Sequence, residues 1–309
     1  MAGLALALVP PSAEPAEADA RGVPPDAPPG VRYVAYTPRD FAIEAGVARP
    51  ATAQGIRLDL ERLRPYFDGL VTYSALAGHE HIPGLAQALG YRAMVLGVWD
   101  PTSQTELESA IRLARAFPDL IVAVAVGNEG LFWRRYDWPT LRRAITRVRE
   151  ALPGVPVTTS EPFAVYLDDP YPGFLDAQDF LLPNVHPTFE SWFRPEAVGQ
   201  SVDFVVRVVD LLLRRADRPV LVKETGLPSG PADRGYTPER QAEFWRTLAE
   251  RIPLAPGRAF AWFEAFDAPW KPAAQARDSG VVAAEEGHWG LLDSGGRPKP
   301  TLSGLSRQP

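Results

Sequence analysis

One pattern recurs along the chain from residue 31: a short run of β-branched and apolar residues, a polar or Gly/Pro break, and then a helical stretch. Several runs are almost continuously apolar, which is typical of parallel strands buried on both faces. Eight such repeats predict an α/β chain folded as a closed (β/α)8 TIM barrel with one core. The predicted strands are Val31–Tyr36, Leu70–Tyr73, Ala93–Val98, Leu120–Val126, Pro156–Thr159, Phe180–Val185, Pro219–Lys223 and Arg258–Phe263.

The segments between these runs carry helical periodicity and helix-start signals. Ser103 precedes Glu106 at the spacing of a capping box, and Thr237 followed by Pro238 is typical of a helix start. The fifth connection is rich in Pro and Asp, and we expect only a short helix over Gly173–Ala177 there. The other predicted helices are Leu58–Pro65, Ile82–Leu89, Glu106–Phe117, Leu141–Leu152, Val202–Arg215 and Pro238–Arg251.

An open doubly wound sheet is the other architecture compatible with this alternation. Such a sheet would carry a Gly-rich phosphate loop after its first strand, and the segment Tyr36–Arg39 contains no glycine. We therefore favour the barrel, as a single domain over residues 31–305.

Residues 1–30 differ in composition from the rest of the chain. An apolar run, Ala2–Val9, leads into Pro/Ala/Glu-rich sequence. Such composition buries too little surface to offset its ordering entropy, so we expect a disordered leader or linker. The run lacks the basic flank of a signal peptide and is too short to span a bilayer. We expect no stable membrane span, and interpret the run as compatible with the remnant of an export or anchor segment.

Charge and composition narrow the classes of partner. The 309 residues contain 32 Lys and Arg against 38 Asp and Glu, a net charge of −6, without a long basic run. Nucleic-acid binding needs clustered basic residues, so we expect no nucleic-acid partner. Cysteine is absent, which excludes disulfides and thiolate metal sites. The pair His79 and His81 is more typical of a solvated loop than of a metal site, and we predict neither a metal nor a cofactor.

Carboxylates and aromatic residues gather where the predicted strands end, the face on which barrel enzymes build their active sites. Glu129 closes the fourth strand and Glu224 the seventh, and these strands lie nearly opposite across the mouth. A single carboxylate at a strand end is commonly structural. Two carboxyl groups about 5 Å apart, one protonated and one ionised, are what retaining hydrolysis of a glycosidic bond requires. The paired positions therefore favour a catalytic interpretation.

Other residues at the strand ends are candidates for substrate binding, because sugar rings stack on flat apolar faces while their hydroxyls meet polar groups. For His186, a core histidine beneath the mouth is an alternative. Trp133 and Trp192 are equally compatible with plugs over the barrel core. The candidate contacts are Tyr36, Tyr73, Trp99, Glu161, His186, Phe266 and Trp270.

Four stretches carry a family resemblance that extends over about residues 31–300. They are Val126–Glu129 (Val-Gly-Asn-Glu), Lys223–Ser229 (Lys-Glu-Thr-Gly-Leu-Pro-Ser), Trp262–Lys271 and His288–Leu292. In this order they resemble the acid/base, nucleophile, eighth-strand and closing motifs of glycoside hydrolase family 17. That family groups β-1,3-glucanases and glucanosyltransferases within the retaining (β/α)8-barrel clan.

The resemblance implies roles for three residues. Glu129 is expected to be the general acid/base, Glu224 the nucleophile, and Asn128 the donor to the 2-hydroxyl of the sugar at the cleavage point. Leu227 stands where the family usually has Trp, which affects one packing or subsite contact. Lys223 replaces a commoner small residue, and strand alternation would turn its side chain away from Glu224, so we interpret it as structural.

Glu264 and Lys271 are further candidates for the substrate site. Glu264 is placed to orient Glu224 by hydrogen bonding, and Lys271 to favour its ionisation. The alternative is a surface ion pair, which is common and weak.

The leading hypothesis is a retaining glycoside hydrolase that cleaves β-1,3-glucosidic bonds in β-glucans through a glycosyl-enzyme intermediate. One alternative is a β-1,3-glucanosyltransferase that uses the same residues with a glucan chain as acceptor. Others are a non-catalytic glucan-binding barrel and a barrel hydrolase for another linkage, such as β-1,4. We expect a β-glucan as the partner of a monomer outside the cytoplasm, either periplasmic or secreted.

Overall fold

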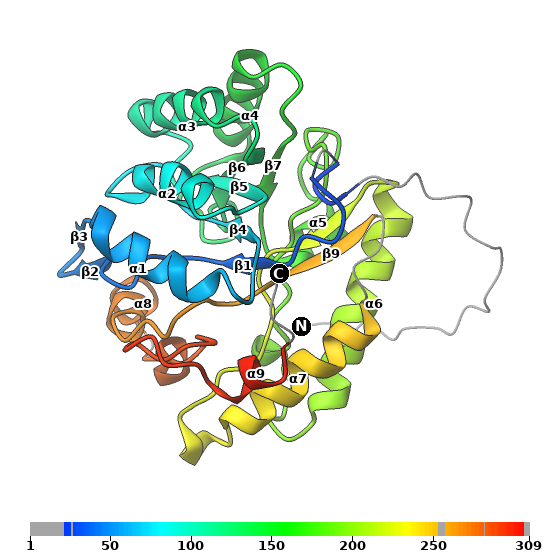
Figure 1. Cartoon of the computed structure of the whole chain (residues 1–309). Coiled ribbons are helices and arrows are strands. Elements are labelled where there is room, and N and C mark those ends of the chain that lie inside the picture. The colour runs from blue at the N-terminus through cyan, green and yellow to red at the C-terminus, as the bar shows by residue number, and fades with distance from the viewer. Residues whose placement is uncertain (1–21, 26, 253–256, 281, 306–309) are drawn as a thin grey trace.

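The computed structural model describes residues 22–25, 27–252, 257–280 and 282–305. At its centre a curled, parallel sheet is surrounded by helices (Figure 1). Its strands are hydrogen-bonded in the order β7-β6-β5-β4-β1-β9-β8, so the first and last strands of the chain meet where β1 pairs with β9. The strands are β1 (Tyr33–Ala35), β4 (Gly69–Val71), β5 (Ala93–Val98), β6 (Ile121–Asn128), β7 (Val157–Ser160), β8 (Val220–Val222) and β9 (Arg258–Trp262).

Residues 180–185 close the gap between β7 and β8 without forming a regular strand. Asn184 is bridged in parallel to Pro162 beyond the end of β7 and to Glu224 beyond the end of β8. Because Pro183 has no N–H, it cannot donate to a continuous ladder here. The predicted α/β barrel is therefore confirmed as a TIM-barrel-like fold, with separate bridges in place of its sixth strand.

Helices cover the outside of the sheet and alternate with its strands (Figure 1). A short α9 packs against α7 near the end of the described chain. The helices are α1 (Ala53–Leu63), α2 (Ile82–Ala88), α3 (Gln104–Ala116), α4 (Trp138–Ala151), α5 (Phe163–Asp168), α6 (Val198–Ala216), α7 (Pro238–Arg251), α8 (Lys271–Ser279) and α9 (Pro300–Ser303).

Two helices begin at the residues that the sequence predicts. The Ser103 hydroxyl accepts from the Glu106 N–H at 3.2 Å at the start of α3, and Thr237 caps α7 with Pro238 in its first turn. Glu106 does not complete a capping box. Its buried carboxylate instead accepts from the loops after β4 and β5, including the Trp99 N–H at 3.0 Å. The first turn of α3 therefore ties down two loops at the carboxyl end of the sheet.

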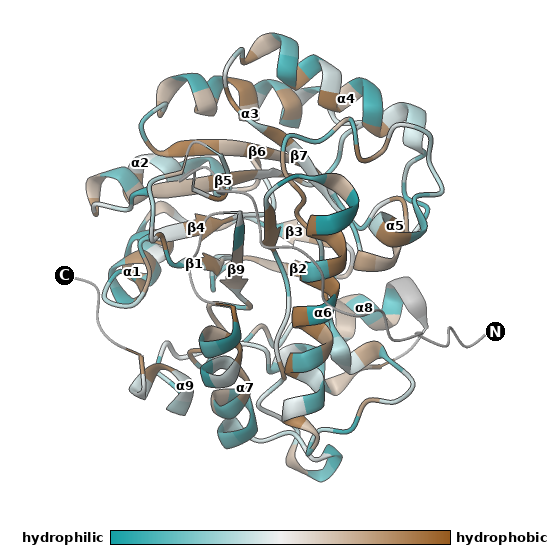
Figure 2. Ribbon diagram, turned by 90° about the vertical axis from the view of Figure 1, so that its right-hand side faces the viewer, coloured by the Kyte–Doolittle hydropathy of each residue, from teal (hydrophilic) through white to brown (hydrophobic). Residues whose placement is uncertain are grey.

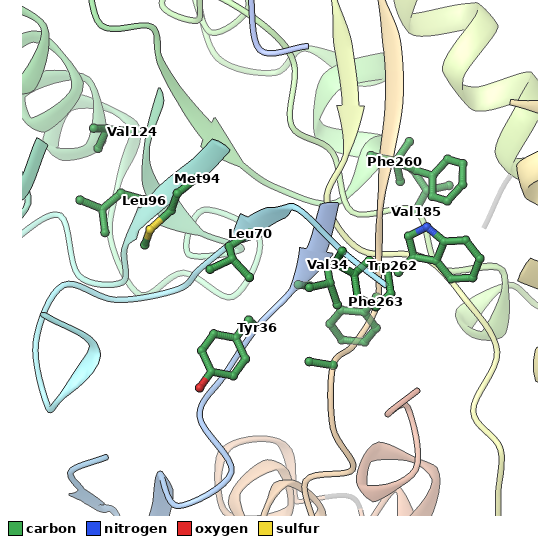
Figure 3. Close-up of a cluster of buried hydrophobic side chains, with 14 of the residues drawn as sticks. Val34, Tyr36, Leu70, Met94, Leu96, Val124, Val185, Phe260, Trp262 and Phe263 are labelled. Atoms are coloured by element: carbon green, nitrogen blue, oxygen red, sulfur yellow. The ribbon is translucent and has the colours of Figure 1, made fainter. Parts of the chain in front are cut away.

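Side chains alternate along the strands between two hydrophobic clusters. The inner cluster, within the curled sheet, takes Tyr33 from β1 and Leu221 from β8. The outer cluster joins the opposite strand faces to the helices, and Figure 3 shows Val34, Met94 and Trp262 among its members. Figure 2 shows the same division, with apolar strands at the centre and helices that carry apolar and polar faces. Burial on both strand faces explains the nearly continuous apolar runs.

Several further parts of the fold differ from the sequence prediction. The helix expected over Gly173–Ala177 is wrong, since Gly173 has φ +75° and the segment forms turns. The fifth connection instead contains α5, which directly follows Pro162. No prediction covered α8 or an antiparallel hairpin after the first barrel strand. That hairpin consists of β2 (Ala42–Glu44) and β3 (Val47–Arg49).

The expected leader lies mostly outside the described residues, which begin at residue 22 and omit residue 26. The apolar run Ala2–Val9 falls within the omitted part. Val23 and Ala27 are each 6% exposed and belong to the inner cluster, so packing begins before residue 31. Among the described helices, none combines the length and apolar character needed to cross a membrane.

The contact between α7 and β9 gives a test of the fold. Trp245 is fully buried, and its ring stacks on Trp262 with centroids 4.7 Å apart. We expect Trp245→Ala to lower the free energy of unfolding by about 3–5 kcal/mol, because it leaves a large cavity. Trp245→Phe retains a ring and should cost less than about 1.5 kcal/mol. Urea denaturation measures both, and equal losses in the two variants would contradict this packing.

Candidate active site

Glu129 follows β6 directly and adopts a backbone conformation that is unusual for its residue type. Its φ is +53°, in the left-handed region that L-residues seldom occupy. Gly127, two residues earlier, has φ +84°, and a Cβ there would collide with the Tyr136 hydroxyl. Strained residues of this kind cluster at functional sites. The Gly-Asn-Glu sequence therefore reflects a turn that sets the direction of the Glu129 side chain.

Two side chains donate hydrogen bonds to the Glu129 carboxyl group. Asn184 Nδ2 lies 2.8 Å from Oε1, and Trp133 Nε1 lies 3.3 Å from Oε2. The Ser160 hydroxyl donates to Asn184 Oδ1 at 3.1 Å, which fixes the orientation of that amide. Burial and then the charge of Glu224 raise the pKa of Glu129 above its ordinary value of 4.5. Sequence reasoning missed Asn184, whose segment shows no motif.

Glu224 lies just beyond the end of β8, and its surroundings lower its pKa, whereas those of Glu129 raise the pKa of that residue. His186 Nε2 lies 3.4 Å from Oε2, and Lys223 Nζ lies 4.0 Å from Oε1. Burial alone would raise the pKa of Glu224, but the His186 hydrogen bond and the charges of Lys223 and Lys271 lower it below 4.5. Glu129 and Glu224 therefore differ in their tendency to hold a proton, as one acid and one base require.

Lys223 does not have the remote, structural position that strand alternation suggested. Its Nζ donates to Asn128 Oδ1 at 2.6 Å and lies 4.2 Å from the Tyr73 ring centroid. Alternation does turn this side chain into the barrel, on the same strand face as Leu221. The interior just beneath the strand ends, however, is where Asn128, Tyr73 and Glu224 converge. The long side chain reaches all three.

Glu264 and Lys271 form a close ion pair, and the surface interpretation is wrong. Lys271 Nζ lies 2.6 and 2.7 Å from the two carboxylate oxygens, and Glu264 is only 2% exposed. Burial raises the pKa of Glu264 to about 7, against the effect of Lys271. Lys271 also contributes to the lowered pKa of Glu224. Lys271 therefore acts on Glu224 as the sequence suggested, whereas Glu264 is engaged by Lys271.

Glu161 anchors a loop, and its prediction as an accessible sugar contact does not fit the structure. The residue is fully buried, and its carboxylate accepts from the backbone N–H groups of Leu131 and Phe132 at 3.0 and 3.2 Å. Burial raises the pKa of Glu161 to about 7 even though these hydrogen bonds oppose the change. The anchored loop carries Trp133, so Glu161 acts on the site through this loop.

Two further predicted contacts are buried and therefore wrong. Tyr36 is fully buried and donates to Asp59 Oδ2 at 3.2 Å, and Phe266 is 3% exposed with its ring edge against Tyr36. His186 fits the alternative of a core histidine beneath the mouth, and its contact with a sugar stays a prediction. This histidine is 9% exposed, its ring lies 5.1 Å from that of Trp289, and its Nε2 reaches Glu224.

Aromatic side chains with open faces lie on the loops after several strands. Trp99 is 42% exposed and carries the Arg135 guanidinium 4.2 Å from its ring centroid. Trp133 and Phe189 are 54% and 62% exposed, which excludes Trp133 as a plug. Trp270 is half-buried with its ring against Phe41, and Trp192 packs on Phe204. In the part of the chain that the structure describes, no group of three or more His, Asp or Glu residues is arranged to hold a metal.

Comparison with known proteins identifies the family of this chain. The BtgE/BtgC glycoside hydrolase domain matches residues 33–290. The chain belongs to this family. The matched range contains both Glu129 and Glu224.

Curated relatives of this BtgE/BtgC-type chain are distant. It is 27% identical to a glucan 1,3-beta-glucosidase of Arthroderma benhamiae, over 84% of this chain and 89% of that protein. It is 25% identical to the glucan endo-1,3-beta-glucosidase btgC of Emericella nidulans, over 67% of this chain but only 35% of that protein. The match therefore spans about a third of the btgC protein.

Solved structures show the same fold. An endo-laminarinase from Formosa Hel1_33_131 superposes with a TM-score of 0.67 at 18% identity, covering 90% of this chain and 89% of that one. A glycoside hydrolase family 17 beta-1,3-glucanosyltransferase from Rhizomucor miehei gives a TM-score of 0.67 at 19% identity, covering 88% and 96%. At these identities the likeness establishes the barrel architecture alone.

The Glu161 anchor can be tested by Glu161→Gln. The neutral amide can accept from one N–H but presents its own NH2 to the other, so the loop should lose about 2 kcal/mol of local stability. Hydrogen exchange at the Leu131 and Phe132 amides should then be about 30-fold faster. Glu108→Gln removes an exposed carboxylate of an ion pair and serves as the matched control. Equal exchange in both variants would rule out the anchor.

Proposed function

We propose that this chain is a retaining glycoside hydrolase that cleaves β-1,3-glucosidic bonds in β-glucans, with Glu224 as nucleophile and Glu129 as general acid/base. One arrangement carries the proposal: Glu129 and Glu224 lie just beyond the ends of β6 and β8, in surroundings that raise the pKa of Glu129 and lower that of Glu224. Asn184 links the two, since its backbone pairs with Glu224 and its amide donates to Glu129. The site thus offers one proton donor and one anion.

The proposed reaction has two steps. In the first, a Glu224 carboxylate oxygen bonds to the anomeric carbon as the glycosidic C–O bond breaks, and Glu129 gives its proton to the leaving oxygen. In the second, Glu129 takes a proton from water, whose oxygen bonds to the anomeric carbon as the bond to Glu224 breaks. The two displacements restore the starting configuration at the anomeric carbon. They also return Glu129 and Glu224 to the protonation states in which they began. With a glucan hydroxyl in place of water, the same residues would transfer the chain.

The assignment of a β-1,3 linkage rests on sequence similarity. The distant relatives are a glucan 1,3-beta-glucosidase and a glucan endo-1,3-beta-glucosidase by name. The Val126–Glu129 and Lys223–Ser229 motifs, together with the barrel likeness, support membership of glycoside hydrolase family 17 in particular. Asn128 would donate to the 2-hydroxyl of the bound sugar. Its Oδ1 is already occupied by Lys223, which leaves Nδ2 as the free donor.

The exposed rings of Trp99, Trp133 and Phe189 supply faces for further glucosyl units, because sugar rings stack on aromatic faces. The partner would then be a β-glucan oligosaccharide or polysaccharide. Since such polymers lie outside the cytoplasm, we place the protein there as well, secreted or periplasmic and acting as a monomer. Sedimentation of the purified chain and fractionation of its natural host address these two points.

One assay tests both which linkage is cleaved and whether the chain hydrolyses, transfers or only binds glucan. We expect the purified chain to release oligosaccharides from laminarin, with at least about 100-fold lower rates on cellulose, because a site that hydrogen-bonds hydroxyl groups in fixed positions discriminates against a chain that leaves its polar groups unpaired. NMR of the first products should show the β-anomer. Products longer than the substrate would identify a glucanosyltransferase. Glucan binding without any product would instead identify a binding module, and faster cleavage of cellulose would overturn the linkage.

The two carboxylate roles can be separated with substrates that differ in leaving group. Glu224→Ala should abolish turnover of both laminarin and an activated aryl β-laminaribioside, since no bond to the anomeric carbon can form. Glu129→Ala should lose at least about 100-fold on laminarin but retain formation of the glycosyl-enzyme from the aryl substrate, whose leaving group needs no proton. Glu150→Ala, on the exposed face of α4, is the matched control. Full activity of Glu224→Ala would refute the nucleophile assignment.

A further inference from the structure

Lys223 has a buried ammonium group, and no carboxylate of the described residues lies within hydrogen-bonding distance of it. The residue is 1% exposed, and its hydrogen bond within the described chain goes to the neutral Asn128 Oδ1, at 2.6 Å. Glu224 Oε1 lies further away, at 4.0 Å. A buried charge is costly unless it is paired or hydrogen-bonded. A close structural ion pair therefore does not explain why a charged lysine is buried at this position.

The position of Lys223 joins three strand ends. Its own residue lies just after β8, Asn128 ends β6, and the ring of Tyr73, two residues after β4, lies 4.2 Å from Nζ. Leu221, on the same face of β8, belongs to the inner hydrophobic cluster. The ammonium therefore forms the boundary between the apolar barrel interior below and the carboxyl groups above.

The hydrogen bond to Asn128 has a directional consequence. A lysine ammonium has three donors and no acceptor, so the amide must turn its oxygen to Lys223 and its NH2 group away. This orientation is the one that the proposed sugar contact needs. Lys223 thereby imposes a single orientation on an amide that would otherwise have two.

The charge of Lys223 has a second consequence, at Glu224. Glu224 Oε1 is buried and has no hydrogen-bond partner among the described residues, and the ammonium at 4.0 Å is a positive charge directed at it. An opposite charge at about 4–6 Å favours the ionised carboxylate. Removal of that charge makes the anion less stable, although the Tyr73 side chain also interacts with this carboxylate.

We propose that Lys223 is a positioning residue of this site, which orients the Asn128 amide toward the substrate and, by its charge, keeps Glu224 ionised. The inference rests on the proposed function for its effect on turnover. Its two physical parts, an amide orientation and a charge effect on one carboxyl group, exist in the free protein. They can therefore be measured there.

The groups around Lys223 determine when its charge is present. Burial lowers the pKa of Lys223 to about 8, against the opposing effects of Glu224, Glu129 and Glu161, while Arg135 lowers it further. Tyr73 presents its ring face. Below about pH 8 Lys223 is charged and supports the Glu224 anion; above this pH the charge is lost. At that pH the Glu224 carboxyl group is ionised with or without the ammonium, because its own pKa is lowered from the ordinary value of 4.5. The charge of Lys223 should therefore affect activity on the acid side, where Glu224 takes up its proton.

The test compares Lys223→Met, which keeps most of the side-chain length but removes the charge, with Lys223→Arg, which keeps the charge. Lys299→Met is the matched control, since Lys299 is another largely buried lysine, paired with Asp267 at 2.6 Å. We expect Lys223→Met to lower kcat/KM on laminarin about 100-fold, as a misplaced contact can. Its acid limb should move to higher pH, because a neutral side chain no longer favours the anion. Lys223→Arg should keep the acid limb of the wild type, because the guanidinium remains charged.

A titration of Glu224 in the free protein separates this inference from the proposed function. The carboxyl ¹³C signal of Glu224, assigned with Glu224→Gln, should titrate at higher pH in Lys223→Met than in the wild type or Lys299→Met. An unchanged Glu224 titration in a folded Lys223→Met protein would overturn the inference even if glucan is cleaved. A shifted titration in a protein that cleaves no glucan would uphold the charge effect and refute the function instead. Should Lys223→Met fail to fold, Lys223→Gln is titrated in the same way.

Discussion

The cost of ionising a carboxyl group in a buried environment governs the carboxyl end of this barrel. Glu161, Glu224 and Glu264 are all buried there, and burial is the largest influence on the pKa of each. The three residues differ in the neighbouring groups that offset the cost of burying a negative charge. Glu161 obtains two backbone N–H groups, and Glu264 obtains the close ammonium of Lys271. In both, the pKa remains at about 7.

Glu224 differs because several weaker partners act together on it. His186 contributes a hydrogen bond, and Lys223 and Lys271 contribute charge, and their sum exceeds the effect of burial. Glu129 has only neutral donors, Asn184 and Trp133, so burial and the neighbouring anion prevail. The opposite pKa shifts of Glu129 and Glu224 therefore follow from the kind of partner that surrounds each carboxyl group. It does not require any difference between the two side chains themselves.

The barrel itself was predictable from the sequence, because strands buried on both faces leave apolar runs that repeat with the helices. The positions of Glu129 and Glu224 at strand ends followed from the same pattern. Asn184 was not predictable, since a bridge between strands depends on spatial neighbours. Lys223 was misjudged because alternation gives the direction of a side chain but not what lies there. Tyr36 and Glu161 were misjudged because a strand end can point beneath the mouth as well as into it.

The seam at residues 180–185 gives this barrel one weaker side. Its pairing consists of isolated bridges, and Pro183 cannot donate, whereas β5 and β6 share a longer continuous ladder. Protein segments open locally with free energies that follow their hydrogen bonding and packing. Asn184 lies in this seam and contacts both candidate catalytic strand ends. Fluctuations that part the seam would therefore separate Glu129 from Glu224 while the remaining sheet stays folded, so heat would disrupt this site before it unfolds the barrel.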